Sequence, residues 1–125
     1  MGNRFLRLAV LYLIAGVALG IAMAASGDHS LAPVHAHVNL LGWVSLALFG
    51  LWYRAHPAAA QTRLAKAHFW IHNLALPVAM VALALLLKGN AAALPVTAVC
   101  SILLGLGVLC FAANLWRHTG LSGSA

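Results

Sequence analysis

The chain has 125 residues, of which 64% are hydrophobic and only 6% are charged. A soluble domain usually carries about a quarter charged residues, so this composition excludes an ordinary water-soluble fold. The net charge of +6 comes from seven Lys and Arg residues against one acidic residue, Asp28. These basic residues flank apolar runs and form no patch with interleaved aromatics, so we expect no nucleic-acid partner. We predict an integral membrane protein whose first partner is the lipid bilayer.

Four apolar segments follow one another along the chain, each near the length of about 20 residues that crosses a bilayer as a helix. They cover residues 5–25, 33–53, 67–87 and 94–116. The short connections between them predict antiparallel neighbours. Pro33 and Pro95 suit the first turns of the second and fourth helices. We expect one all-α membrane domain over residues 1–125, built as an up-down four-helix bundle.

The basic residues also predict an orientation. Six of the seven lie in the N-terminal segment, the middle loop and the C-terminal segment, and the other two loops carry only Lys88. Lys and Arg are enriched on the cytoplasmic side of membrane proteins. We therefore expect both termini to be cytoplasmic, in a bacterial inner membrane.

The first apolar segment carries two further signals. Gly16 and Gly20 form a GxxxG pattern, which permits a close approach by a second helix. Arg4 and Arg7 before the apolar core, with AMAASG after it, also fit a cleavable signal peptide. We expect a first span rather than a cleaved leader.

Seven histidines are the residues that bear chemistry. Three lie in loops or at helix ends, where an imidazole is simply solvated: His29, His56 and His118. The other four lie inside the predicted spans: His35, His37, His68 and His72. Ionisable residues inside a membrane are usually functional, and no carboxylate is near enough in sequence to pair with these four. The alternative is interhelical hydrogen bonding, worth about 0.6 kcal/mol on average, but two pairs of histidines favour ligation of a metal or haem.

The spacing of each pair predicts the helix face that it occupies. His68 and His72 are four residues apart and share one face, which Ala75, Ala79 and Ala82 continue as a smooth strip for a flat cofactor. His35 and His37 are two residues apart and point to nearly opposite sides. The His35 side continues through Asn39, Gly42, Phe49 and Tyr53, and the His37 side through Leu41, Val44, Leu48 and Leu51. One of the two can thus face the bundle and the other a neighbouring chain of a homo-oligomer.

The composition of the ligand set narrows the choice of cofactor. Zinc usually takes four ligands that include Cys or a carboxylate, and neither lies near these histidines. Imidazoles in an apolar slot suit haem iron or copper. Small residues leave flat space for a porphyrin, and Arg54, Arg63 and Lys66 are available to its propionates. No nucleophile, carboxylate pair or phosphate-binding loop supports an enzymatic assignment.

The stretch PVHAHVNLLGW, residues 33–43, resembles the second helix of the catalytic subunit of haem–copper oxidases, especially nitric oxide reductases. In that family an H-x-N segment after a proline supplies an axial histidine to the low-spin haem b. The resemblance implies that His37 is an axial ligand and that Asn39 supports it. The chain is also similar to short four-helix membrane proteins identified as cytochrome c oxidase subunit I-like, whose HFWIHN-type third helix matches His68 to Asn73. The chain lacks the length and the HPE-type copper motif of a full oxidase subunit, so oxygen reduction is not implied.

We therefore expect a b-type cytochrome in which His37 and His72 hold haem b, with His35 and His68 as further candidates, for electron transfer or diatomic gas binding. One alternative is a copper-binding membrane protein with His35 and His37 as ligands. Another is an accessory or assembly partner of a respiratory oxidase, whose histidines only form hydrogen bonds. The spans place the two pairs near opposite membrane faces, which makes one shared iron difficult within one chain. Two haems at two depths, an oligomer and different helix boundaries remain open.

Overall fold

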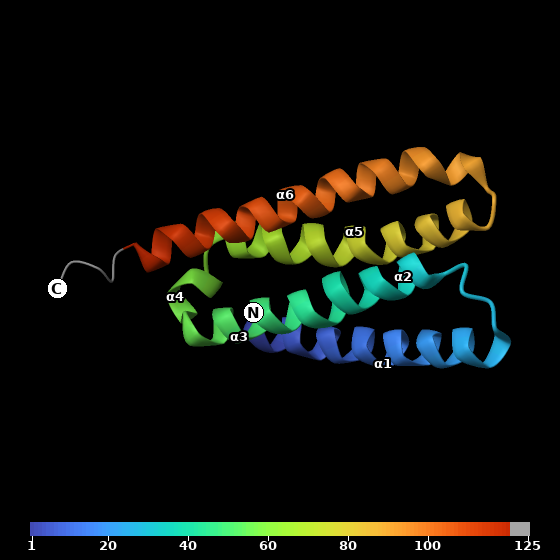
Figure 1. Cartoon of the computed structure of the whole chain (residues 1–125). Helices are drawn as coiled ribbons and strands as arrows, with labels where there is room; N and C mark the ends of the chain where they lie inside the picture. Colours follow the sequence, from blue (N-terminus) through green and yellow to red (C-terminus); the bar gives the residue numbers. More distant parts are fainter. Residues whose placement is uncertain (121–125) are drawn as a thin grey trace.

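The computed structural model describes residues 1–120, which are helical throughout apart from the connections. The elements are α1 (Gly2–Ser26), α2 (Ala32–His37), the π-helix η1 (Val38–Val44), α3 (Ser45–Ala55), α4 (Pro57–Ala60), α5 (Arg63–Leu87), the 3₁₀ turn η2 (Ala91–Ala93) and α6 (Leu94–Thr119). α2, η1 and α3 run on without a break and form one long rod, called the second rod below (Figure 1).

Four helical segments are long and apolar enough to cross a membrane: Gly2–Ser26, Ala32–Ala55, Arg63–Leu87 and Ala91–Thr119. Each contains one of the four predicted spans and extends it by no more than four residues at either end. Within residues 1–120, the all-α class is therefore confirmed, as are four helices that are long and apolar enough to span a membrane.

Local chemistry explains where the long helices begin and end. α1 ends at Gly27, which has a left-handed φ of 70° and donates its N–H to the Met23 carbonyl. α5 begins after Thr62, whose hydroxyl accepts the Ala65 N–H at 3.1 Å. Pro33 and Pro95 lie in the first turns of α2 and α6, as predicted.

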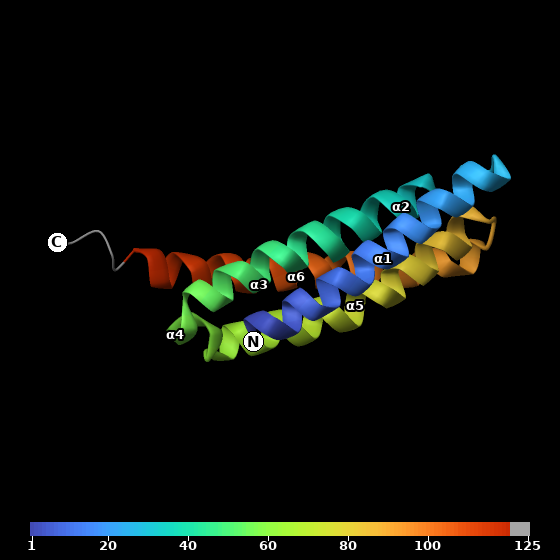
Figure 2. The same cartoon turned by 90° about the horizontal axis from the view of Figure 1, so that it is seen from below.

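The helices associate as two pairs. α1 lies along the second rod, and α5 lies along α6 (Figures 1 and 2). Glycines set the close approach within the first pair: a Cβ at Gly16 would lie 2.5 Å from the Asn39 side chain, and one at Gly20 would lie 3.0 Å from His35. The GxxxG pattern thus does permit close helix approach, as predicted.

Large aromatic side chains join the two pairs. Phe5 of α1 contacts Phe69 of α5 with ring centroids 5.1 Å apart, and Phe49 of α3 contacts Phe111 of α6 at 4.5 Å. Phe5 and Tyr53 are almost completely buried. We call this group, with His68 at its centre, the aromatic cluster. A second, aliphatic cluster lies towards the other end of the bundle and includes Val34, Val38, Leu76 and Leu104.

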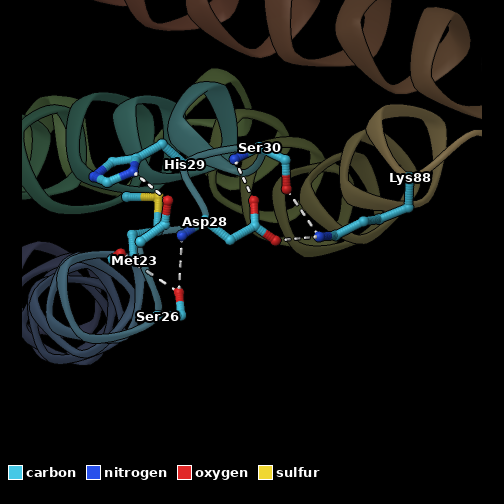
Figure 3. A network of polar contacts seen from close by, with 7 residues as sticks. Met23, Ser26, Asp28, His29, Ser30 and Lys88 are labelled. Atoms are coloured by element: carbon cyan, nitrogen blue, oxygen red, sulfur yellow. Dashed lines mark hydrogen bonds and ion pairs between the residues drawn. The ribbon is translucent and has the colours of Figure 1, made fainter.

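A network of polar contacts links the two loops at the end of the bundle remote from α4 (Figure 3). Lys88 Nζ lies 3.2 Å from Asp28 Oδ2 and donates to Ser30 Oγ at 2.8 Å. The Ser30 backbone N–H donates to Asp28 Oδ1 at 2.9 Å. This ion pair joins the α1–α2 connection to the end of α5, and so ties one helix pair to the other.

The Asp28 carboxyl is expected to titrate far below its usual range. Its pKa is lowered from 3.8 to about 2, first by the Ser30 backbone hydrogen bond, then by the Ser30 side chain and Lys88. Because the carboxyl pKa is lower in the folded chain, the ionised carboxylate stabilises the folded loops at a pH above about 4. This stabilisation is lost as the pH falls from about 4 to about 2. Because Asp28 is the one acidic side chain in the sequence, a carbon-detected NMR titration follows it without ambiguity. Lys88→Gln should raise its midpoint yet leave it below 3.8, whereas an unshifted midpoint in the native chain would contradict the loop contacts.

Candidate functional site

His68 and His72 lie on the inner face of α5, and neither has any exposed surface. Their ring centroids are 5.8 Å apart. Ala75, Ala79 and Ala82 are also buried, which confirms the predicted shared face. The strip is not an open slot, however, because Ala75 and Ala79 pack within the aliphatic cluster.

His68 is enclosed by aromatic rings. Phe49, Phe5 and Phe111 lie with centroids 4.5, 5.0 and 5.3 Å from its ring. Its Nδ1 forms a hydrogen bond of 3.1 Å with the Tyr53 hydroxyl, which crosses from α3 to α5. Its Nε2 is buried without a hydrogen-bond partner. His68 lines neither of the two grooves described below.

His72 is bound to the backbone of the second rod. Its Nε2 lies 3.0 Å from the Leu41 carbonyl oxygen. A carbonyl only accepts hydrogen bonds, so Nε2 carries the proton and Nδ1 is the bare nitrogen. That Nδ1 is buried without a hydrogen-bond partner. His72 is therefore an interhelical donor with one unused acceptor.

His35 and Asn39 face α1. The Asn39 amide donates to the His35 carbonyl at 2.9 Å and lies 3.4 Å from His35 Nδ1. His35 packs against Gly20 and Asn39 against Gly16. Both side chains therefore serve the contact between α1 and the second rod, on the bundle-facing side that the spacing predicted.

His37 lies on the opposite side and is exposed at the molecular surface. Its Nδ1 lies 2.7 Å from the Pro33 carbonyl oxygen, one turn earlier. The carbonyl again requires that this nitrogen carries the proton, which leaves the Nε2 lone pair available to a metal. Orientation of a ligating imidazole by a backbone carbonyl is a common feature of metal-binding histidines.

His37 lines a groove of about 480 Å³ between the second rod, α5 and α6. The other lining residues are mostly apolar: Leu41, Ala79, Met80, Leu83, Ser101, Leu104, Gly105, Val108 and Leu109. A somewhat larger groove of about 530 Å³ beside α5 and α6 is lined by apolar residues and Asn90, and has no metal ligand. The His37 groove is thus a cavity in which a histidine side chain meets open apolar space.

The structure brings some of the predicted residues together and keeps others apart. His68 and His72 are neighbours, whereas His37 lines a groove to which neither contributes. Within residues 1–120, no group of three or more His, Cys, Asp or Glu side chains is placed to hold one metal ion. His72 therefore takes no part in the lining of the His37 groove.

The residue pattern does not predict three features of the site. They are the bond of Tyr53 to His68, the Leu41 carbonyl that accepts from His72, and Met80 in the lining of the groove. The π-helix has no marker in its residue pattern beyond Gly42. Tyr53 was assigned to the correct helix face, but its partner depends on how two distant helices meet.

Comparison with known proteins gives no further guide: no protein-family model, no curated protein and no solved structure matches this chain. The resemblance of residues 33–43 to the haem-ligand helix of haem–copper oxidases therefore stays a prediction from a short motif.

Proposed function

We propose that this chain is a membrane protein that binds haem b in the groove beside His37. The observation that carries the proposal is the His37 imidazole itself. Its Nδ1 is fixed by the Pro33 carbonyl at 2.7 Å, and its ring lines an apolar groove of about 480 Å³. Of the four candidate histidines, only His37 lies in the lining of this groove.

The groove suits a porphyrin in size and chemistry. Small-molecule sites usually measure about 300–1,000 Å³ and are mainly apolar, with a few placed polar groups. Gly105 leaves flat space, because a Cβ at this position would meet nothing within 4 Å. Met80 contributes a thioether to the same lining, and Met is a known axial ligand of haem iron beside His.

Different residues of the groove would have different roles in holding haem. His37 would bind the iron, the Pro33 carbonyl orients the imidazole, and the apolar walls exclude water from one face. Bound haem would supply one-electron transfer, or diatomic gas binding where one axial position stays open. Ligand identity, hydrogen bonds to the ligands and burial are the properties through which the protein would tune such a centre.

We further propose that the bundle lies up-down in a bacterial inner membrane with both termini cytoplasmic. The asymmetry of Lys and Arg supports this orientation. A homo-oligomer would cover the groove, which opens at the surface of the single chain, and a redox partner or respiratory complex would exchange electrons with the haem. The orientation rests on the distribution of Lys and Arg, the oligomer on the exposure of the groove, and the redox partner on the haem proposal.

The test of haem binding is an absorption spectrum of the full chain purified in detergent after expression with ample haem. A sharp α-band on dithionite reduction, with a pyridine haemochrome value near one haem per chain, is the expected result. Addition of carbon monoxide to the reduced protein should shift the band if one axial position is open. Colourless protein, from cells in which a control cytochrome is fully loaded, would overturn the proposal.

A second candidate is an accessory or assembly partner whose histidines only hold helices together. The specific observation in its favour is that His35, His68 and His72 each already form a hydrogen bond within the fold. A colourless, metal-free protein that co-purifies with an oxidase would support this role. Copper, with His35 and His37 as ligands, stays the other alternative; stoichiometric copper in a colourless purified protein would support it.

A further inference from the structure

The second rod contains a π-helical segment, which is unusual. η1 spans Val38–Val44, and the Ser45 N–H bonds to the Leu40 carbonyl five residues earlier. On either side the bonds are shorter in span: Val38 N–H reaches the His35 and Val34 carbonyls, three and four residues earlier, and His56 N–H reaches Trp52, four residues earlier. π-turns inside α-helices are rare and occur frequently at functional sites.

Where the backbone N–H groups change from bonding five residues back to bonding four residues back, one carbonyl receives no backbone N–H. That carbonyl then needs another hydrogen-bond donor. Leu41 follows Leu40 directly at this change, and its carbonyl accepts the His72 Nε2–H at 3.0 Å. The donor comes from α5 and has no exposed surface. Inside a membrane no water is at hand to replace it. His72 therefore satisfies the backbone group that the π-helix sets free.

The π-helix fixes how the two halves of the second rod are rotated relative to each other. Each α-helical residue turns the chain by about 100°, because a turn takes 3.6 residues. Conversion of η1 to α-helix would rotate α2 by about that angle relative to α3. His35 would leave Gly20, and His37 would leave the groove.

We infer that His72 is a positioning residue: by donating to the Leu41 carbonyl it holds η1 in its π-helical form and so keeps His37 in the groove and His35 against Gly20. The consequence for haem rests on the proposed function, whereas the consequence for the helix does not. His72 thus acts through the backbone of the second rod and need not touch the cofactor.

The experiment compares the full chain in detergent with His72→Leu, which removes the donor, and His72→Gln, whose amide keeps one. His68→Leu is the matched control, because it removes a buried imidazole one turn away that bonds to Tyr53 of α3 and not to η1. Two readouts are used: the nuclear Overhauser contact between the His35 ring and Gly20, and the haem content. The first is independent of haem.

We expect His72→Leu to lose the His35–Gly20 contact and to bind haem about 10- to 100-fold more weakly, the usual cost of removing a group that orients a ligand. His72→Gln and His68→Leu should keep the contact. Deletion of Leu40, which is 60% exposed, removes the extra residue of the π-helix. The deletion should restore the contact in the His72→Leu background.

A His72→Leu chain that keeps the His35–Gly20 contact would overturn the inference, whether or not the chain binds haem. Equal loss of the contact in His68→Leu would also overturn it, because general damage to the core would then explain the result. If the contact behaves as expected but no variant binds haem, the positioning role stands and the haem proposal fails.

Discussion

Replacement of His37 by Ala should weaken haem binding by more than about 100-fold. Groups that merely orient a metal ligand are worth 10- to 100-fold in affinity, and loss of the ligand itself should cost more. The reduced α-band should therefore vanish from purified protein at micromolar concentration. The side chain is exposed and bonds only to Pro33 of its own helix, so the fold should survive. The measurement is the reduced-minus-oxidised spectrum, with the helical content followed by circular dichroism.

His29→Ala is the matched control for this variant. His29 is likewise exposed and likewise bonds through Nδ1 to a backbone carbonyl, that of Gly27, but it lies in a loop. The His29→Ala substitution should leave the haem content unchanged. His37→Gly with added imidazole should recover the band, since a free imidazole can occupy the vacated ligand position. An unaltered band in His37→Ala would remove His37 from the site and leave Met80 or a second chain to hold the iron.

Replacement of Gly42 by Ala should destabilise the fold by about 1–3 kcal/mol, the usual cost of overpacking a filled interface. The new methyl would lie 2.5 Å from Tyr12 Cγ and 2.7 Å from Tyr12 Cβ. Because Cβ is attached directly to the backbone, relief requires α1 to move away from η1. The better helix propensity of Ala offsets at most about 1 kcal/mol of this cost. The free energy of unfolding in mixed micelles of detergent and sodium dodecyl sulfate is the quantity to measure.

Gly105→Ala is the control for the glycine series. Gly105 lies inside α6, and an added Cβ there would meet nothing within 4 Å. The stability should stay the same or rise by up to about 1 kcal/mol, through propensity alone. If the Gly42 variant proved as stable as the Gly105 variant, α1 would not approach η1 as closely as the structure shows.

Composition and pattern were sufficient for the fold class and the spans. Apolar runs of about 20 residues have one stable solution in a bilayer, because every backbone polar group must be paired within its own helix. Spacing was also sufficient to separate the faces of the second rod. Val44, Leu48 and Leu51 are exposed on the His37 side, whereas Gly42, Phe49 and Tyr53 are buried on the other.

The partners of His68 and His72 were decided by tertiary structure alone. His68 meets Tyr53, and His72 meets the Leu41 carbonyl 31 residues away, because α5 lies against the second rod at that depth. The sequence singles out His37 only through a short motif, and the meeting of three helical segments is what places its side chain on a groove. Hydrophobic periodicity fixes which face of a helix is buried. Which polar atoms then meet depends on the rotation and offset between helices, and a π-turn of a few residues changes both.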